Sequence, residues 1–237
     1  GVFAVLTTTW LVMRALGVGP EGSLVAAGVL RDRESILVDD FRGPPSDSLL
    51  GAVVTSAFRT DLSQSQAVSV VQPTRVSAAL RRMQRPAGSR LDLTLAREVA
   101  VREGIKAVLD GEIDAIGPTY VLQVRLVSAD SGQELAAFRE TADDARGLLP
   151  AVDRLSRKLR GRVGESLRTV RASMALEQVT TGSLDALRKY AAAEHAISVD
   201  GDYAKGAVLL QEAIALDTAF AMAYRKLGVV LGNSGGP

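Results

Sequence analysis

Paired carboxylates are the residues in this sequence whose type and spacing could do chemistry. Asp39 and Asp40 follow the apolar residues 36–38, and Glu112 and Asp114 lie in a second short apolar segment. Two neighbouring carboxyl groups at strand ends can bind a cation, or act as general acid and base where their pKa values differ. Strand-end carboxylates more often serve as turn and cap groups, so we expect no catalytic residue among them. A small-ligand-binding or enzymatic α/β domain, with a polar pocket at Asp39, Asp40 and Glu112, is the alternative.

The residue types exclude other kinds of site. The 237 residues contain no Cys and one His, His195. Without Cys there is no disulfide, thiolate nucleophile or Cys-ligated metal, and one His rules out a multi-histidine metal site. We therefore expect no metal-binding residue and no cofactor, and we interpret His195 as a partly exposed helix residue.

Two segments imitate the motifs of a kinase. Gly17-x-Gly19-x-x-Gly22 matches a glycine-rich loop, and the segment 40–43, Asp-Phe-Arg-Gly, is one insertion away from a metal-binding Asp-Phe-Gly. Pro20 removes a backbone amide that a phosphate-binding loop would use, and no His-Arg-Asp catalytic loop is present. This chain is therefore predicted neither to bind ATP nor to transfer phosphate.

The charge is nearly balanced, at a net +1, so the composition predicts no nucleic-acid partner. One segment is locally basic, and we expect it to form the solvated face of a helix. An anionic lipid or nucleic-acid surface is a weaker alternative, because no aromatic residues alternate with the basic ones. The basic residues are Arg154, Arg157, Lys158, Arg160, Arg162, Arg168 and Arg171.

The first residues predict a membrane anchor. Residues 1–13 are apolar, and Trp10 and Arg14 suit the interface at the end of a span, so residues 1–18 are expected to be part of a transmembrane helix. A core helix or the remains of a signal peptide is the alternative. Residues 19–34 then form a juxtamembrane tether.

Residues 35–171 alternate as an α/β domain does. Strands are expected at 36–41 and 68–71, with helices after Pro44, after Pro73 and from residue 93 to 103. Three further strands, at 107–113, 120–127 and 134–140, are joined by short turns and predict an antiparallel meander. A helix that packs back on the sheet follows from the spacing of Leu148, Val152, Leu155, Leu159 and Val163.

Residues 172–182 are expected to be a linker, and residues 183–237 contain no strand signal and predict three helices with turns at 200–202 and 217–218. The fold class is therefore α/β, a mixed sheet with an antiparallel meander, followed by an all-α part.

The all-α part resembles tetratricopeptide repeats. The resemblance rests on Gly201-Asp-Tyr203, Ala213, the Ala-Leu-Asp at 215–217, and the segment 223–228, Ala-Tyr-Arg-Lys-Leu-Gly. Gly206 and Thr218 depart from the pattern, which usually has Ala and Pro there. About one and a half repeats are covered, so the array is expected to be truncated.

The α/β part resembles the TolB N-terminal-like module that precedes such repeats in bacterial signalling proteins. The matching segments are 36–41, 96–99, 107–112 and 126–132. The order of span, module and repeats is most similar to the region after the kinase domain of membrane-bound bacterial Ser/Thr protein kinases. The same module also follows adenylate cyclase and DNA-binding regulator domains, which are the alternatives for the upstream domain. The resemblance to the kinases implies a bacterial inner-membrane protein, with a cytoplasmic kinase upstream and residues after about 20 in the periplasm.

The resulting hypothesis is a non-catalytic sensory or scaffolding region of a membrane-anchored signalling protein. Its expected partners are a protein or peptide through the helical repeats, the membrane through the N-terminal helix, and a second copy in a homo-oligomer. The expected protein-binding residues are Tyr190, Phe220, Tyr224 and Leu227. The final helix should dock through Ala223, Leu227 and Leu231, and leave Phe220 or Tyr224 exposed.

Overall fold

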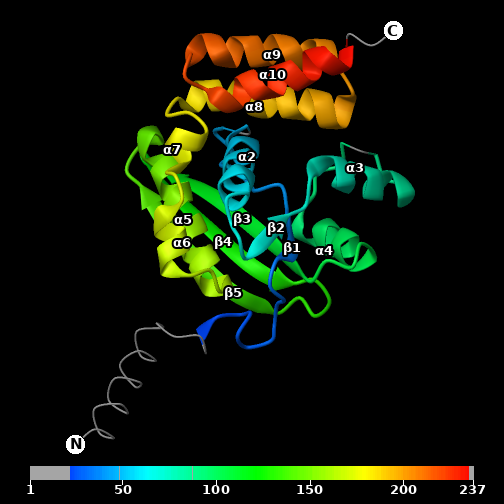
Figure 1. The fold of residues 1–237 in the computed structure, drawn as a ribbon, viewed down its shortest axis with the longest axis vertical. Helices are drawn as coiled ribbons and strands as arrows, with labels where there is room; N and C mark the ends of the chain where they lie inside the picture. The colour runs from blue at the N-terminus through cyan, green and yellow to red at the C-terminus, as the bar shows by residue number, and fades with distance from the viewer. Residues whose placement is uncertain (1–21, 48, 87, 235–237) are drawn as a thin grey trace, which may run out of the picture.

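The computed structural model describes residues 22–47, 49–86 and 88–234. Within them a mixed five-stranded sheet carries helices on both faces, and three further helices stack at one end (Figure 1). The strands are β1 (Glu34–Val38), β2 (Val68–Val70), β3 (Ala107–Ile116), β4 (Thr119–Ser128) and β5 (Glu134–Ala142). The helices of the α/β part are α2 (Leu50–Leu62), α3 (Pro73–Arg82), α4 (Leu93–Arg102), the 3-10 turn η2 (Ala145–Gly147), α5 (Leu148–Val163) and α6 (Leu167–Ala172). They are followed by α7 (Leu176–Val179), α8 (Leu184–His195), the π-helical turn η3 (Ala196–Asp200), α9 (Tyr203–Leu216) and α10 (Ala221–Ser234).

The sheet has the order β2-β1-β3-β4-β5 and confirms the predicted mixed architecture. β1 pairs in parallel with β2 and β3, while β3, β4 and β5 form the antiparallel meander. The centre of β1 is apolar because both its faces are covered. Ile36 and Val38 pack toward α2 and α5, and Leu37 packs toward α3 and α4.

Alternation along β4 shows which face of the meander is covered. Leu122, Val124 and Leu126 are buried on the side of α5. Gln123 is exposed on the other side, and Arg125 there is half-buried. The five apolar residues that predicted α5 are all completely buried, so this helix packs on the sheet as expected.

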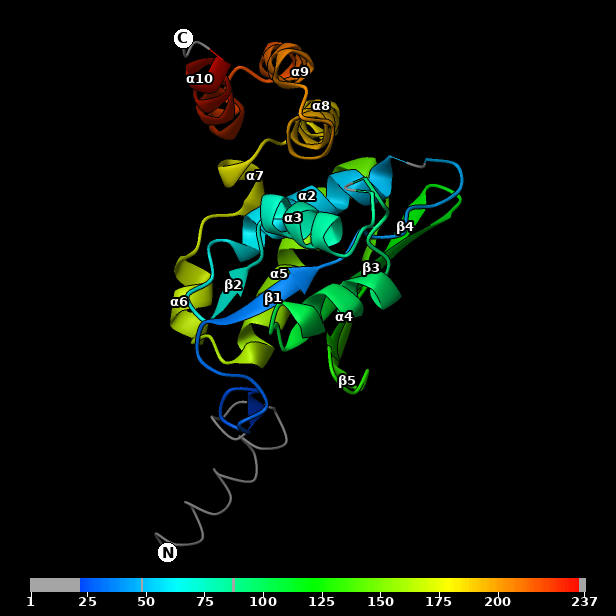
Figure 2. The ribbon, with the colours of Figure 1, turned by 90° about the vertical axis from the view of Figure 1, so that its right-hand side faces the viewer.

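The predicted three helices at the end of the chain are present, and they continue the core of the sheet. α8 packs on α2, α9 on α8 and α10 on α9 (Figure 2). One cluster of buried side chains runs from the sheet through Leu187 of α8 and Leu210 of α9 to Phe220 and Val230. The division into domains at 171–183 stays a prediction.

The contact surface of α10 differs from the expected one. Ala223 is buried as predicted, but Leu231 is 51% exposed and Val230 is buried instead. Each residue advances about 100° around a helix, so seven residues bring Val230 back to the face of Ala223, whereas Leu231 lies well away from it.

The predicted tether, residues 19–34, and the predicted linker, residues 172–182, both pack on the fold where the structure describes them. The backbone N–H groups of Leu24 and Val25 donate to the carbonyls of Arg162 and Val163 at 3.0 Å, and Leu24 and Leu30 are buried. In the expected linker 172–182, Leu176 of α7 is also buried. The predicted membrane helix, residues 1–18, lies outside the described residues. Among the helices described, none has the length and apolar character needed to cross a bilayer.

Candidate functional site

The predicted carboxylate pairs do not gather in one polar pocket. Asp39 is buried beside β3, whereas Asp40 lies past the end of β1, where its Oδ2 accepts a hydrogen bond from the Leu91 backbone at 2.7 Å. Glu112 accepts from the Arg42 guanidinium at 2.8 Å, and Asp114 is exposed. The single pocket that the alternative hypothesis placed at Asp39, Asp40 and Glu112 is therefore not formed. Asp39 and Asp40 are adjacent at a strand end and point to opposite sides, and Glu112 is paired with Arg42.

Asp39 has a carboxyl neighbour that sequence reasoning missed. Its backbone N–H bonds to the Leu109 carbonyl, which sets its side chain beside Asp110 on the next strand. Burial, and then the proximity of Asp110, raise the pKa of Asp39 to about 9. Asp110 is itself paired with Arg125, whose Nε lies 2.9 Å from Oδ2. At neutral pH Asp39 is thus a buried neutral acid next to a paired carboxylate.

Asp39 is not fully satisfied by hydrogen bonds. Its Oδ1 atom is buried, and among the described residues it has no hydrogen-bond partner. The signal that could have indicated Asp110 is a charged residue inside the apolar segment 107–111. A charge within a strand covered on both faces requires a partner in the fold, and Arg125 on β4 provides it.

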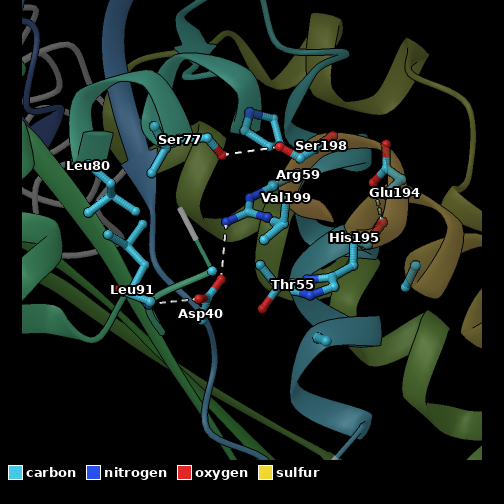
Figure 3. A pocket seen from close by; sticks show the side chains of 17 residues that line it. Asp40, Thr55, Arg59, Ser77, Leu80, Leu91, Glu194, His195, Ser198 and Val199 are labelled. Atoms are coloured by element: carbon cyan, nitrogen blue, oxygen red, sulfur yellow. Dashed lines mark hydrogen bonds and ion pairs between the residues drawn. The ribbon is translucent and has the colours of Figure 1, made fainter. Parts of the chain in front are cut away.

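A cavity lies past the carboxyl end of β1, between the sheet, α2, α3 and the end of α8 (Figure 3). Its volume is about 140 Å³. α2 supplies the polar side chains of Thr55, Ser56 and Arg59, and α8 supplies Glu194 and His195. The remaining wall comes from α3, η3 and the loop before α4: Ser77, Leu80, Ser89, Leu91, Ser198 and Val199.

Arg59 is the central charge of this cavity. Its Nη2 donates to the Val38 carbonyl at 2.9 Å and lies 3.7 Å from Oδ1 of Asp40. Burial lowers the pKa of Arg59, and Asp40 and Glu194 oppose that effect. Glu194 accepts a hydrogen bond from the Ser56 hydroxyl at 3.1 Å and lies 3.5 Å from Nζ of Lys226.

The sequence predicted neither Arg59 nor Glu194 as a site residue. Each is one of many charged residues on a helix, and no local pattern distinguishes it. His195 is partly exposed, as interpreted from the sequence, and its Nε2 lies 3.8 Å from Asp200. The part of the chain that the structure describes holds no group of three or more His, Asp or Glu side chains placed to bind a metal ion.

The locally basic segment is not a uniform solvated face, which corrects the expectation. Arg154 and Lys158 both pair with Glu140 of β5 at 2.7 and 2.6 Å. Arg160 is completely buried and pairs with Glu165 at 2.8 Å. Ion pairs that α5 makes with the sheet and with its own C-terminal loop thus neutralise much of the basic charge.

The four residues expected to bind protein lie in two different environments. Tyr190 and Phe220 are buried against each other with ring centroids 5.2 Å apart, so of Phe220 and Tyr224, one of which was expected to be exposed, Phe220 is the buried one. Phe220 precedes α10, and its ring packs into the core that the C-terminal helices share. Tyr224 is 51% exposed, and Leu227 is half-buried. The binding role of all four stays a prediction.

No protein-family model and no curated protein sequence matches this chain. Several solved structures are similar to part of this chain. The C-terminal domain of LpoB from Escherichia coli is 19% identical, and the match covers 48% of this chain and 84% of that one with a TM-score of 0.44. Lipoprotein GNA1162 from Neisseria meningitidis is 20% identical over 56% of this chain and 98% of that one, with a TM-score of 0.40.

TolB from Acinetobacter baumannii is 14% identical, and the match covers 57% of this chain and 29% of that one with a TM-score of 0.38. At these identities and TM-scores, the similarity assigns no function to this chain.

Proposed function

We propose that this chain is a non-catalytic sensory or scaffolding region that binds a protein partner through α10. The proposal is carried by an exposed apolar stripe on that helix. Tyr224 is 51% exposed, Leu227 is half-buried three residues later, and Leu231 is 51% exposed after four more. This spacing places all three side chains along one side of the helix, which we call the α10 stripe.

The stripe is suited to receive another helix. Gly228 lies between Leu227 and Leu231, and a methyl group added at this glycine would meet nothing within 4 Å. The helix surface is therefore open at Gly228, which lies next to Tyr224 and Leu231 of the stripe. An amphipathic helix of a partner could lay its apolar face along such a surface, with Tyr224 as an aromatic anchor.

Three more specific parts of the proposed function rest on the sequence resemblance alone. They are an upstream Ser/Thr kinase domain, anchoring in the bacterial inner membrane by residues 1–18, and a periplasmic location of the described residues. A homo-oligomer formed through the α10 stripe is a variant of the same proposal, in which the partner helix comes from a second copy.

Selection of amphipathic helical peptides by display on the wild-type chain tests the α10 stripe. Peptides bound there should lose at least about tenfold in affinity when Tyr224 is replaced by serine, because interface tyrosines are frequent hot spots. The matched control is Tyr203→Ser on α9, since Tyr203 is 45% exposed and lies outside the stripe. Failure to select peptides, or equal losses in both variants, would contradict the proposal.

A further inference from the structure

The cavity at the end of β1 lies where open α/β sheets bind ligands. From β1 the chain crosses to β2 on one side, while β3, on the other side of β1, continues away to β4. Connections that diverge from two adjacent strands leave a crevice outside their carboxyl ends. Asp40 follows β1 at this point and lines the cavity.

The charged side chains of the cavity are complementary to a ligand that carries both an amine and an acid group. Two carboxylates, Asp40 and Glu194, line the cavity together with the guanidinium of Arg59, and all three are partly exposed. Lys226, which does not line the cavity, also lies 3.5 Å from Glu194. A guanidinium has five N–H donors, and within the described residues the bond to Val38 is the one hydrogen bond that Arg59 makes.

Its contact with Asp40, at 3.7 Å, is longer than a hydrogen bond, and Figure 3 shows the guanidinium directed toward that carboxylate. N–H donors of Arg59 therefore remain for an incoming carboxylate, which an arginine binds with two parallel bonds. Asp40 and Glu194 provide acceptors for an ammonium group.

The rest of the wall is suited to a short aliphatic side chain. Leu80 and Leu91 are buried on one side, and Val199 of η3 also lines the cavity. A cavity of about 150 Å³ binds benzene, a molecule of six non-hydrogen atoms, so a volume of about 140 Å³ accommodates the four side-chain carbons of leucine or the three of valine. The carboxylate and ammonium groups of such a ligand would contact the partly exposed Arg59, Asp40 and Glu194.

We infer that this cavity is a binding site for a free aliphatic α-amino acid. Its carboxylate is held by Arg59, its ammonium group by Asp40 and Glu194, and its side chain by the apolar wall. Because α2 and α3 form one side of the site, and α8 and η3 the other, the bound amino acid connects the α/β part to the C-terminal helices. This site is separate from the α10 stripe, so each proposal can fail without the other.

Titration calorimetry of the full chain with L-leucine tests the site. Leucinol lacks the carboxylate and 4-methylpentanoate lacks the ammonium group, and each should bind at least about tenfold more weakly than L-leucine. In hydrogen exchange, L-leucine should slow the amides of η3 and the end of α8, and leave those of β5 unchanged.

Two substitutions should abolish binding. Arg59→Met removes the carboxylate partner, and its matched control is Arg81→Met on the exposed side of α3. Ala52→Phe blocks the cavity from an exposed position of α2, so it keeps the test valid if Arg59→Met fails to fold. The absence of L-leucine binding at about 10 mM, or binding that Ala52→Phe leaves unchanged, would overturn the inference.

Discussion

Replacing Arg160 with methionine is expected to lower the free energy of unfolding by about 3–5 kcal/mol. Both members of the Arg160–Glu165 ion pair are buried, and two bonds of 3.0 and 2.8 Å join them. Ser65 donates to Glu165 at 2.6 Å, and Arg160 donates to Ser173 at 3.2 Å. Methionine preserves most of the packing of Arg160, but it leaves the Glu165 carboxylate buried without its counter-charge.

Chemical denaturation of the purified chain measures this effect. The matched control is Arg168→Met on α6, which removes an exposed arginine of the same basic segment and should change stability by less than about 0.5 kcal/mol. Replacing Glu165 with leucine in the Arg160→Met background should recover much of the loss, since no unpaired charge then remains. Equal destabilisation by Arg160→Met and Arg168→Met would show that the pair is not buried in solution.

Replacing Asp39 with asparagine is expected to remove a fall in stability that the wild-type chain shows as pH rises from about 5 to 8. The pKa of Asp39 is raised to about 9 in the folded state, against an ordinary value of 3.8. Between these values the folded chain holds one proton more than the unfolded chain. The free energy of unfolding therefore decreases with pH, by up to about 1.4 kcal/mol per pH unit. Asparagine does not titrate, so the variant lacks this contribution.

Denaturation curves recorded at several pH values test the prediction. The matched control, Asp114→Asn, removes an exposed carboxylate from β3, two strand positions beyond Glu112 on the same face, and should keep the wild-type slope. Burial also raises the pKa of Asp61, which therefore contributes a slope of the same sign in all three proteins. Parallel pH profiles for wild type and Asp39→Asn would mean that Asp39 is ionised in the folded state.

Local periodicity was sufficient to predict most of the elements. Alternation in 120–127 predicted β4 and its buried face, and the spacing from Leu148 to Val163 predicted α5, because both patterns reflect burial of one side of a regular backbone. The meander followed from short turns between consecutive strands. Residues that are close both in sequence and in space produce a local pattern, and the sequence alone is enough to detect it.

The candidate sites depended on contacts between distant parts of the chain. The sequence paired Asp39 with Asp40, whereas parallel pairing of β1 with β3 sets Asp39 beside Asp110, 71 positions away. No pattern in the sequence separates Arg160 from the solvated residues of its helix. Arg160 is paired because the chain reverses direction at Gly164, whose φ is 138°, and this brings Glu165 to the guanidinium.

Arg59 and Glu194 come from helices that the sequence predicted correctly, but the sequence could not show that these helices contact each other. The packing of α8 on α2 brings the two residues to one cavity. The sequence by itself determined most of the secondary structure and most of its buried faces, because hydrophobic burial is periodic along the chain. Only the tertiary structure decided which charged groups meet, because pairing over long distances in sequence follows from packing and leaves no local pattern.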